Sequence, residues 1–183
     1  MRGRYEWEDA QIALAEASGQ AELAQELRWA AFERGLRVQP LRDHLKRLSG
    51  FDDVEAEAQA MISALDHPRF SDALAFLIAW PSTTDAAKLV LSRPDEIEPG
   101  RVELLETAVA MLEVRHPLAA SLLLRAMISD TLRWSRAERA EAARQQIDHL
   151  EALATGISDW SGHETHEAFA DRVSRQGAHR RAG

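Results

Sequence analysis

The 183-residue sequence contains no cysteine, which excludes disulfides, zinc–thiolate sites, iron–sulfur clusters and thiol catalysis. Glycine and proline are scarce, at 9 and 6 residues, and no glycine-rich phosphate loop occurs. No apolar run approaches the roughly 20 residues that a membrane-spanning helix requires. The first nine residues are charged and lack the apolar region of a secretory signal. We therefore expect a cytoplasmic protein that does not enter a membrane.

Basic residues are fewer than acidic ones. The sequence has 22 Lys and Arg against 30 Asp and Glu, which gives a formal net charge of −8. Such a chain is expected to bind neither nucleic acid nor an anionic membrane surface. Residues 84–111 could be read as a helix-turn-helix, but acids outnumber bases there, which argues against DNA binding. The basic residues near the C-terminus lack interleaved aromatics and are expected to be solvated: Arg172, Arg175, His179, Arg180 and Arg181.

Helical periodicity dominates what is present, and the alternation typical of strands is nearly absent. The pattern predicts helices at residues 7–17, 21–34, 40–49, 52–65, 67–80, 84–91, 101–115, 117–134, 136–155 and 163–175. Gly19 and Gly35 follow the first two and suit the left-handed position past a helix end. We therefore expect an all-α fold of nine or ten antiparallel helices, a tetratricopeptide-like or related α-solenoid. It would form one domain over residues 1–175, followed by a disordered tail at 176–183.

Two His-Pro pairs, at residues 67–68 and 116–117, each join a helix to a more apolar one. Proline is favourable at the first helical position, because the N–H it lacks has no partner inside the helix. The spacing of 49 residues falls within the range of helical repeats. The pairs indicate either two related hairpin units or a helix-start signal used twice.

The second predicted helix is apolar on two sides. One face carries Leu23, Leu27, Ala30 and Ala31, and the nearly opposite face carries Trp29, Phe32 and Leu36. A helix that is apolar on two sides is normally packed between neighbours. Either later helices fold over the second face, or another chain covers it. For the second alternative we predict a homodimer through the N-terminal helices, with Trp29 or Phe32 near its centre.

His163 and His166 are the most suggestive pair for metal binding. If a helix begins at His163, two imidazoles three residues apart share one face and could offer two metal ligands. The spacing differs from the zinc-protease pattern His-Glu-x-x-His, and the sequence identifies no third ligand. The alternative is an ordinary helix start, with Glu164 and Glu167 near the positive end of the helix dipole. We expect no metal and no cofactor.

Ser121, Arg125 and Ser129 lie at intervals of four on an otherwise apolar helix. An unpaired buried charge is costly, so Arg125 should have an Asp or Glu side chain, or at least two backbone carbonyls, within hydrogen-bond distance. The structural interpretation is an ion pair or a narrow solvent face. The functional interpretation is a groove that recognises a carboxylate or phosphate through the guanidinium group. Leu123 on the same helix is expected in the core.

An acidic cluster at residues 52–57 comprises Asp52, Asp53, Glu55 and Glu57. It lacks the spacing of a calcium-binding loop. Acidic side chains in a first helical turn are expected from the helix dipole alone. We therefore predict an ordinary helix start here.

Six segments, at residues 7–10, 27–33, 45–48, 51–57, 116–128 and 157–167, together resemble a bacterial domain-of-unknown-function family of all-helical proteins. The best-matching positions include His116, Arg125, Trp160, His163 and His166. The resemblance covers almost the whole chain, and because members are generally longer at the N-terminus, this chain resembles their C-terminal part. It implies an all-helical, repeat-like build and no assigned activity.

No catalytic set is visible, since Gly-x-Ser-x-Gly is absent and no Ser–His–Asp order can be built. We therefore expect a non-catalytic helical-repeat interaction module that binds a protein or peptide partner. Its candidate ligand or partner surface comprises Trp29, Phe32, Leu36, Ser121, Arg125, Ser129, His163 and His166. The alternatives are a metal-dependent hydrolase that uses the His163/His166 helix face, and a structural segment of a longer protein.

Overall fold

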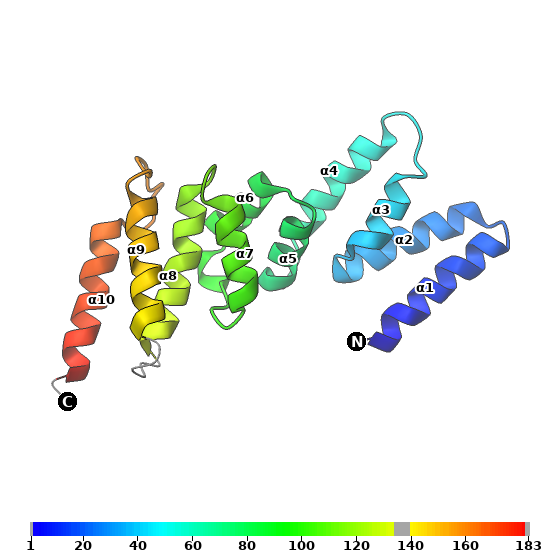
Figure 1. Ribbon diagram of the computed structural model, residues 1–183. Helices are drawn as coiled ribbons and strands as arrows, with labels where there is room; N and C mark the ends of the chain where they lie inside the picture. The colour runs from blue at the N-terminus through cyan, green and yellow to red at the C-terminus, as the bar shows by residue number, and fades with distance from the viewer. Residues whose placement is uncertain (1, 134–139, 182–183) are drawn as a thin grey trace. The chain divides into compact units, whose positions relative to one another are not determined.

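The structure is a computed structural model that describes residues 2–133 and 140–181 (Figure 1). The described residues form ten α-helices, one short 3-10 helix and no strand, which confirms the all-α prediction. None of these helices combines the length and the apolar character needed to cross a membrane. The α-solenoid arrangement stays a prediction.

The helices follow one another with short connections. In chain order they are α1 (Arg2–Ala17), α2 (Ala21–Gly35), α3 (Val38–Leu45), α4 (Asp52–Leu65), α5 (Phe70–Ala79), α6 (Thr83–Ser92), η1 (Pro94–Glu96), α7 (Val102–Leu112), α8 (Pro117–Arg133), α9 (Ala140–Ala154) and α10 (His166–Arg181). The predicted bounds of α4 are confirmed, and Pro117 opens α8 as expected. The backbone of α10 is helical through Arg181, beyond the predicted end at residue 175.

The chain divides into two compact units, unit 1 over Met1–Asp85 and unit 2 over Ala86–Gly183. The boundary falls inside α6. Each unit is described by itself. The single helical-array domain over residues 1–175 stays a prediction.

The two His-Pro pairs have different structural roles. Pro117 is the first residue of α8, where its missing N–H is harmless. The helix after the first pair begins only at Phe70, so Pro68 lies outside it. His67 is buried, and its Nδ1 lies 3.3 Å from the backbone N of Arg69. The prediction that both pairs open a helix is therefore wrong for the first.

The end of α2 also differs from its prediction. Gly19 has the left-handed conformation expected after α1, with φ of +72°. After α2 it is Leu36 that adopts this conformation, with φ of 47°, while Gly35 stays in the helix. A side chain at residue 35 would meet the Tyr5 hydroxyl at 3.1 Å. Gly35 therefore serves close packing of α1 on α2 rather than the turn.

The core of unit 1 is built where α2 meets its neighbours. Helix α2 packs on α1 and α3, and α4 packs on α5. Phe32 is fully buried, and its ring centroid lies 5.3 Å from that of Phe76 on α5. The second apolar face of α2 is thus covered from within the chain at Phe32.

The core of unit 2 is centred on α8, which packs on α7 and α9. Its buried side chains are Ala119, Ala120, Ser121, Leu123, Leu124, Arg125, Met127 and Ile128. Leu123 is fully buried, which confirms the prediction that it belongs to the core. One polar and one charged residue, Ser121 and Arg125, are among these buried side chains, and their hydrogen-bond partners determine which of their polar atoms remain unpaired.

Candidate functional site

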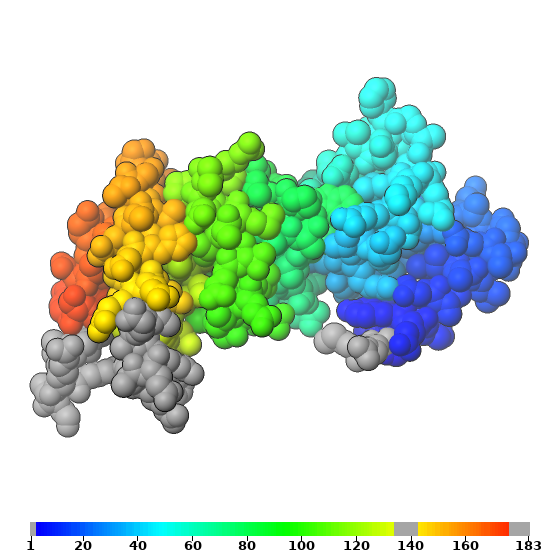
Figure 2. Space-filling view, in the orientation of Figure 1, coloured from blue at the N-terminus to red at the C-terminus, as the bar shows by residue number. Residues whose placement is uncertain are grey.

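An open groove of about 690 Å³ lies between α2, α3 and α4 of unit 1. We name it the Trp29 groove. Its lining residues are Gln25, Glu26, Trp29, His44, Leu48, Asp52, Glu55, Ala56 and Gln59. The connection between α3 and α4 projects from unit 1 (Figure 2, cyan) and carries Phe51, which is 84% exposed. The groove therefore lies beside an apolar side chain that faces solvent.

Trp29 supplies the aromatic surface of this groove. It is half-buried, and its ring lies 5.4 Å from that of Phe32 and 5.3 Å from that of His44. These contacts hold one part of the indole against the core while the remainder stays accessible. A large, preordered aromatic surface of this kind is typical of a binding anchor.

The groove carries charge of one sign. Glu26, Asp52 and Glu55 are exposed carboxylates, and no Lys or Arg is among the lining residues, all of which the structure describes. Burial lowers the pKa of His44, the nearby charge of Arg28 lowers it further, and the hydrogen bond to the Gln25 carbonyl opposes them. His44 is therefore neutral at pH 7, and the groove is net acidic.

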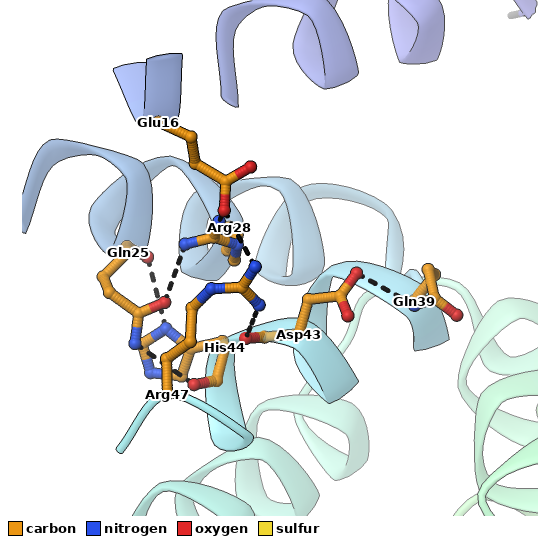
Figure 3. Close-up of polar contacts among 7 residues, drawn as sticks. All are labelled: Glu16, Gln25, Arg28, Gln39, Asp43, His44 and Arg47. Carbon is orange, nitrogen blue, oxygen red and sulfur yellow. Dashed lines mark hydrogen bonds and ion pairs between the residues drawn. The ribbon is translucent and has the colours of Figure 1, made fainter. Parts of the chain in front are cut away.

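A polar network joins the helices behind the groove (Figure 3). The Gln25 side-chain amide donates to the backbone carbonyl of His44 at 3.1 Å, and the His44 Nδ1–H donates to the Gln25 carbonyl at 3.2 Å. Arg28 donates to the Gln25 side chain at 2.9 Å and forms an ion pair with Glu16. Arg47 also donates to Glu16, at 2.8 Å. These bonds fix α3 on α2 and so set the spacing of Trp29 and His44.

Two other members of the predicted surface on α2 are core residues. Phe32 is 0% exposed and Leu36 is 5% exposed, so neither forms a ligand or partner surface. The interpretation of Phe32 as the centre of a dimer interface is wrong, because Phe76 of the same chain covers it. Of the three predicted positions, only Trp29 remains accessible.

The acidic cluster at the start of α4 is divided between two roles. Asp53 accepts a hydrogen bond from the backbone N–H of Val54 at 2.9 Å, and Glu57 accepts one from the Trp80 indole at 2.7 Å. Asp52 and Glu55 line the Trp29 groove instead. The helix-dipole interpretation fits Asp52, Asp53 and Glu55 in the first turn of α4 but not Glu57 further along, and it does not indicate that two of the four line a groove.

The stripe on α8 is not a solvent face. Ser121 is fully buried, and its hydroxyl donates to the Leu118 carbonyl at 2.8 Å. Ser129 is half-buried. Arg125 is 5% exposed, and its Nη1 donates to the backbone carbonyl of Glu164 at 2.5 Å. The predicted ligand role of Ser121 is unsupported, because its hydroxyl is already used within the helix.

Arg125 does have partners, but not those expected. The prediction of a carboxylate or two carbonyls is wrong, since a single carbonyl accepts from it among the described residues. Two aromatic rings also contact the guanidinium group. Its central carbon lies 4.6 Å from the Trp160 ring centroid and 5.1 Å from that of Phe169. Burial lowers the pKa of Arg125, while the charges of Glu164 and Glu167 oppose that shift.

The two histidines do not share a helical face. Helix α10 begins at His166, so His163 lies in the preceding bend, and the prediction of a helix from residue 163 is wrong. Thr165 caps the helix by accepting from the Ala168 N–H at 3.3 Å. Among the described residues no group of three or more His, Asp or Glu could hold a metal ion. Neither histidine belongs to such a group.

Sequence reasoning did not connect His44 with Trp29, nor Trp160 and Phe169 with Arg125. His44 lies one helix away from Trp29, and Trp160 and Phe169 lie more than 30 residues from Arg125 along the chain. Periodicity within one helix carries no information on such contacts. Covariation between these positions is the signal that could have found them.

Comparison with known protein families gives a match over nearly the whole chain. The family of unknown function DUF6880 matches residues 2–183. No curated protein and no solved structure matches. The match confirms the resemblance to an uncharacterised helical family. The chain belongs to the DUF6880 family.

Proposed function

We propose that the protein is a non-catalytic interaction module that binds a basic peptide segment of a partner protein in the Trp29 groove. One observation carries this proposal: a half-buried tryptophan lies in an open groove whose charged lining residues are all acidic. Protein interfaces commonly place an aromatic anchor at the centre and complementary charge around it.

The partner's chemistry follows from the lining. An apolar side chain of the peptide packs on Trp29, Leu48 and Ala56, and Lys or Arg side chains flank it. These cations pair with Glu26, Asp52 and Glu55, which are exposed and reach the groove from two helices. Arginine or lysine stacked on the indole adds a cation–π contribution.

Another groove of unit 1 fits a ligand less well. It has about 680 Å³ and is lined by Glu16, Glu22, Arg28 and Arg47 among others. Its two arginines are bound to Glu16, so its positive charges are paired within the chain. It also lacks an aromatic side chain. The Trp29 groove is therefore the better binding surface.

Selection from short random peptides displayed on phage tests this proposal. The full chain is the bait, and the expected binders carry Lys or Arg on either side of an apolar residue. Trp29→Ala should weaken these binders by about thirtyfold or more, as for a central aromatic anchor. Val114→Ala is the control, because Val114 is an apolar side chain that is 87% exposed in unit 2 and lies outside the groove.

A second comparison removes one acidic charge from the groove and measures the effect on peptide binding. Glu55→Gln should weaken the selected peptides and reduce the salt dependence of their binding, whereas Glu103→Gln on α7 should change neither. Selection of acidic peptides would contradict the proposal. So would peptides that bind the wild type and Trp29→Ala equally well.

A further inference from the structure

Arg125 has an unusual hydrogen-bond deficit for a buried cation. The residue is 5% exposed, and its Nη1 donates to the Glu164 carbonyl. Nε and Nη2 are fully buried, and neither has an acceptor among the described residues. Leaving donors of a buried charged group unpaired is costly, so native sites of this kind call for an acceptor.

The two unpaired nitrogens, Nε and Nη2, lie on the same edge of the guanidinium group. The N–H bonds of Nε and Nη2 point in parallel from one edge of a guanidinium group, and that edge binds a carboxylate with two hydrogen bonds. The same unit contains an example of this geometry. Arg172 uses its Nε and Nη2 to hold the two oxygens of Glu164, at 3.0 Å and 2.9 Å.

Nearby carboxylates are already bound by other groups. Glu164 offers Arg125 only its backbone carbonyl, because its side chain is held by Arg172. The carboxylate of Glu167 accepts from its own backbone N–H and from the Thr165 hydroxyl. The positive charge of Arg125 therefore lacks a hydrogen-bonded counter-charge among the described residues.

A further donor belongs to the same segment. The Nδ1 of His166 is buried and has no hydrogen-bond partner among the described residues. His166 is the first residue of α10 and stands two positions after Glu164, which binds Arg125. Backbone N–H groups in the first turn of a helix add to the attraction for an anion.

We propose that the Nε–Nη2 edge of Arg125 binds a carboxylate group of a small molecule or a peptide, and that His166 at the start of α10 contributes a further hydrogen bond. The rings of Trp160 and Phe169 lie within cation–π distance of the guanidinium. A planar carboxylate pairs with this edge in the guanidinium plane and leaves the Phe169 ring in place, whereas a tetrahedral phosphate carries two further oxygens out of that plane. The site lies wholly in unit 2 and is independent of the Trp29 groove.

The ligand reaches the guanidinium edge by displacing the Trp160 ring. Phe169 is 3% exposed on α10, but Trp160 is half-buried, and its neighbours Asp159 and Ser161 are exposed. Movement of one side chain in an exposed connection is enough to uncover the buried edge. The cation–π contact therefore competes with ligand binding.

Titration of the full chain with acetate, followed through the arginine Nε–Hε resonances in ¹H–¹⁵N spectra, tests the proposal. The Arg125 resonance, assigned from its contacts with ring protons of Trp160 and Phe169, should shift in a saturable manner. Exposed arginines should not follow it. Arg125→Lys keeps the charge but lacks the paired donors, and should weaken acetate binding by about tenfold or more, read from the Trp160 indole resonance.

Arg115→Lys is the matched control, because Arg115 is exposed in the same unit, and it should leave acetate binding unchanged. His166→Ala should weaken binding by a smaller factor than Arg125→Lys. If Arg125→Lys does not fold, the wild-type titration still decides. An unmoved Arg125 resonance, an equal drift of all arginine resonances, or a response to inorganic phosphate but not to acetate overturns the proposal.

Discussion

Arg28 in unit 1 and Arg125 in unit 2 are almost equally buried, at 2% and 5% exposure, yet they are stabilised in different ways. Arg28 forms an ion pair with Glu16 and donates to the amide oxygen of Gln25. Arg125 donates to one backbone carbonyl and contacts two aromatic rings. Among the described residues, a carboxylate is hydrogen-bonded to the first arginine and none is hydrogen-bonded to the second.

The difference separates a structural arginine from a candidate binding residue. A buried cation with its own carboxylate joins helices, and its charge is already paired within the fold. A buried cation whose paired donors lack acceptors is suited to a ligand that carries the missing oxygens. Burial alone therefore does not distinguish the two roles, whereas the partners of the individual nitrogens do.

The largest effect is expected from a cavity in the core around α8. Leu123 is fully buried on the same helix, so Leu123→Ala should lower the free energy of unfolding by about 2 to 5 kcal/mol. Urea unfolding monitored by circular dichroism measures this change, with which the smaller losses expected for other variants of unit 2 can be compared. A loss well under 1 kcal/mol would show that α8 is peripheral.

Removal of the carboxylate from the Arg28 pair comes next. Glu16→Ala leaves Arg28 buried with Gln25 as its remaining hydrogen-bond acceptor among the described residues. Breaking a fully buried pair costs about 3 to 5 kcal/mol. Because the Glu16 side chain is 42% exposed, water can replace part of it, and we expect about 2 kcal/mol. Exposed Glu22 on α2 provides the control, and Glu22→Ala should change stability by less than about 0.5 kcal/mol. Equal losses for both variants would remove the contrast between the two arginines.

Loss of the aromatic partner of Arg125 should lower the free energy of unfolding by less than loss of Glu16 does. Trp160→Ala removes a ring 4.6 Å from a desolvated guanidinium and should cost about 1 to 2 kcal/mol in urea unfolding. If Trp160 covers the guanidinium edge, the same variant should bind acetate at least as tightly as the wild type. Val114→Ala serves as the control, since Val114 is an apolar side chain of the same unit and is 87% exposed. Weaker acetate binding by Trp160→Ala would make the ring part of the site rather than its cover.

Acid should weaken the ion pair next to Arg125. The hydrogen bonds from Arg172 lower the pKa of Glu164 in the folded state. The pair therefore stabilises the fold above the unfolded value near pH 4.3, and the stabilisation is lost as pH falls through the folded-state pKa. Unfolding curves between about pH 5 and pH 3 should show this loss, and Glu164→Gln should flatten it. A pH dependence identical in Glu164→Gln and the wild type would contradict the assignment.

The exposed apolar side chains of the two units allow a final comparison. Trp7 and Leu14 stand seven positions apart on α1, are 60% and 69% exposed, and form the apolar face on which we predict homodimerisation. Light scattering should give the mass of two chains, and Leu14→Glu should give the mass of one. Val114→Glu in unit 2, where Val114 is 87% exposed, should leave the dimer intact. A single-chain mass for the wild type at micromolar concentration would rule out the dimer.

The choice of residue matters in that last experiment. Phe32 was a natural target when only the sequence was considered, because it lies on the second apolar face of α2. It is fully buried against Phe76, so Phe32→Glu would unfold unit 1 rather than separate two chains. The substitution would abolish a dimer for a reason unrelated to its interface.

Much of the secondary structure could be predicted because its signals are local. The bounds of α4, the start of α8 at Pro117 and the left-handed Gly19 follow from helix dipole, proline and glycine preferences within a few residues. The start of α10 could not be predicted as well, because Thr165 is a good cap and competes with the acidic residues that suggested His163. Capping and charge preferences are compatible with several helix start positions within one turn.

The sequence by itself determined that the chain is all helical, and it marked Arg125 as a charge that needs a partner within an apolar helix. Only the tertiary structure decided which partner that is, because the Glu164 carbonyl lies 39 residues away and the aromatic rings belong to the segment around it. It likewise decided that Trp29 lines a groove while Phe32, three residues on, is core. Helix formation depends on neighbours along the chain, whereas burial and the pairing of charges depend on neighbours in space.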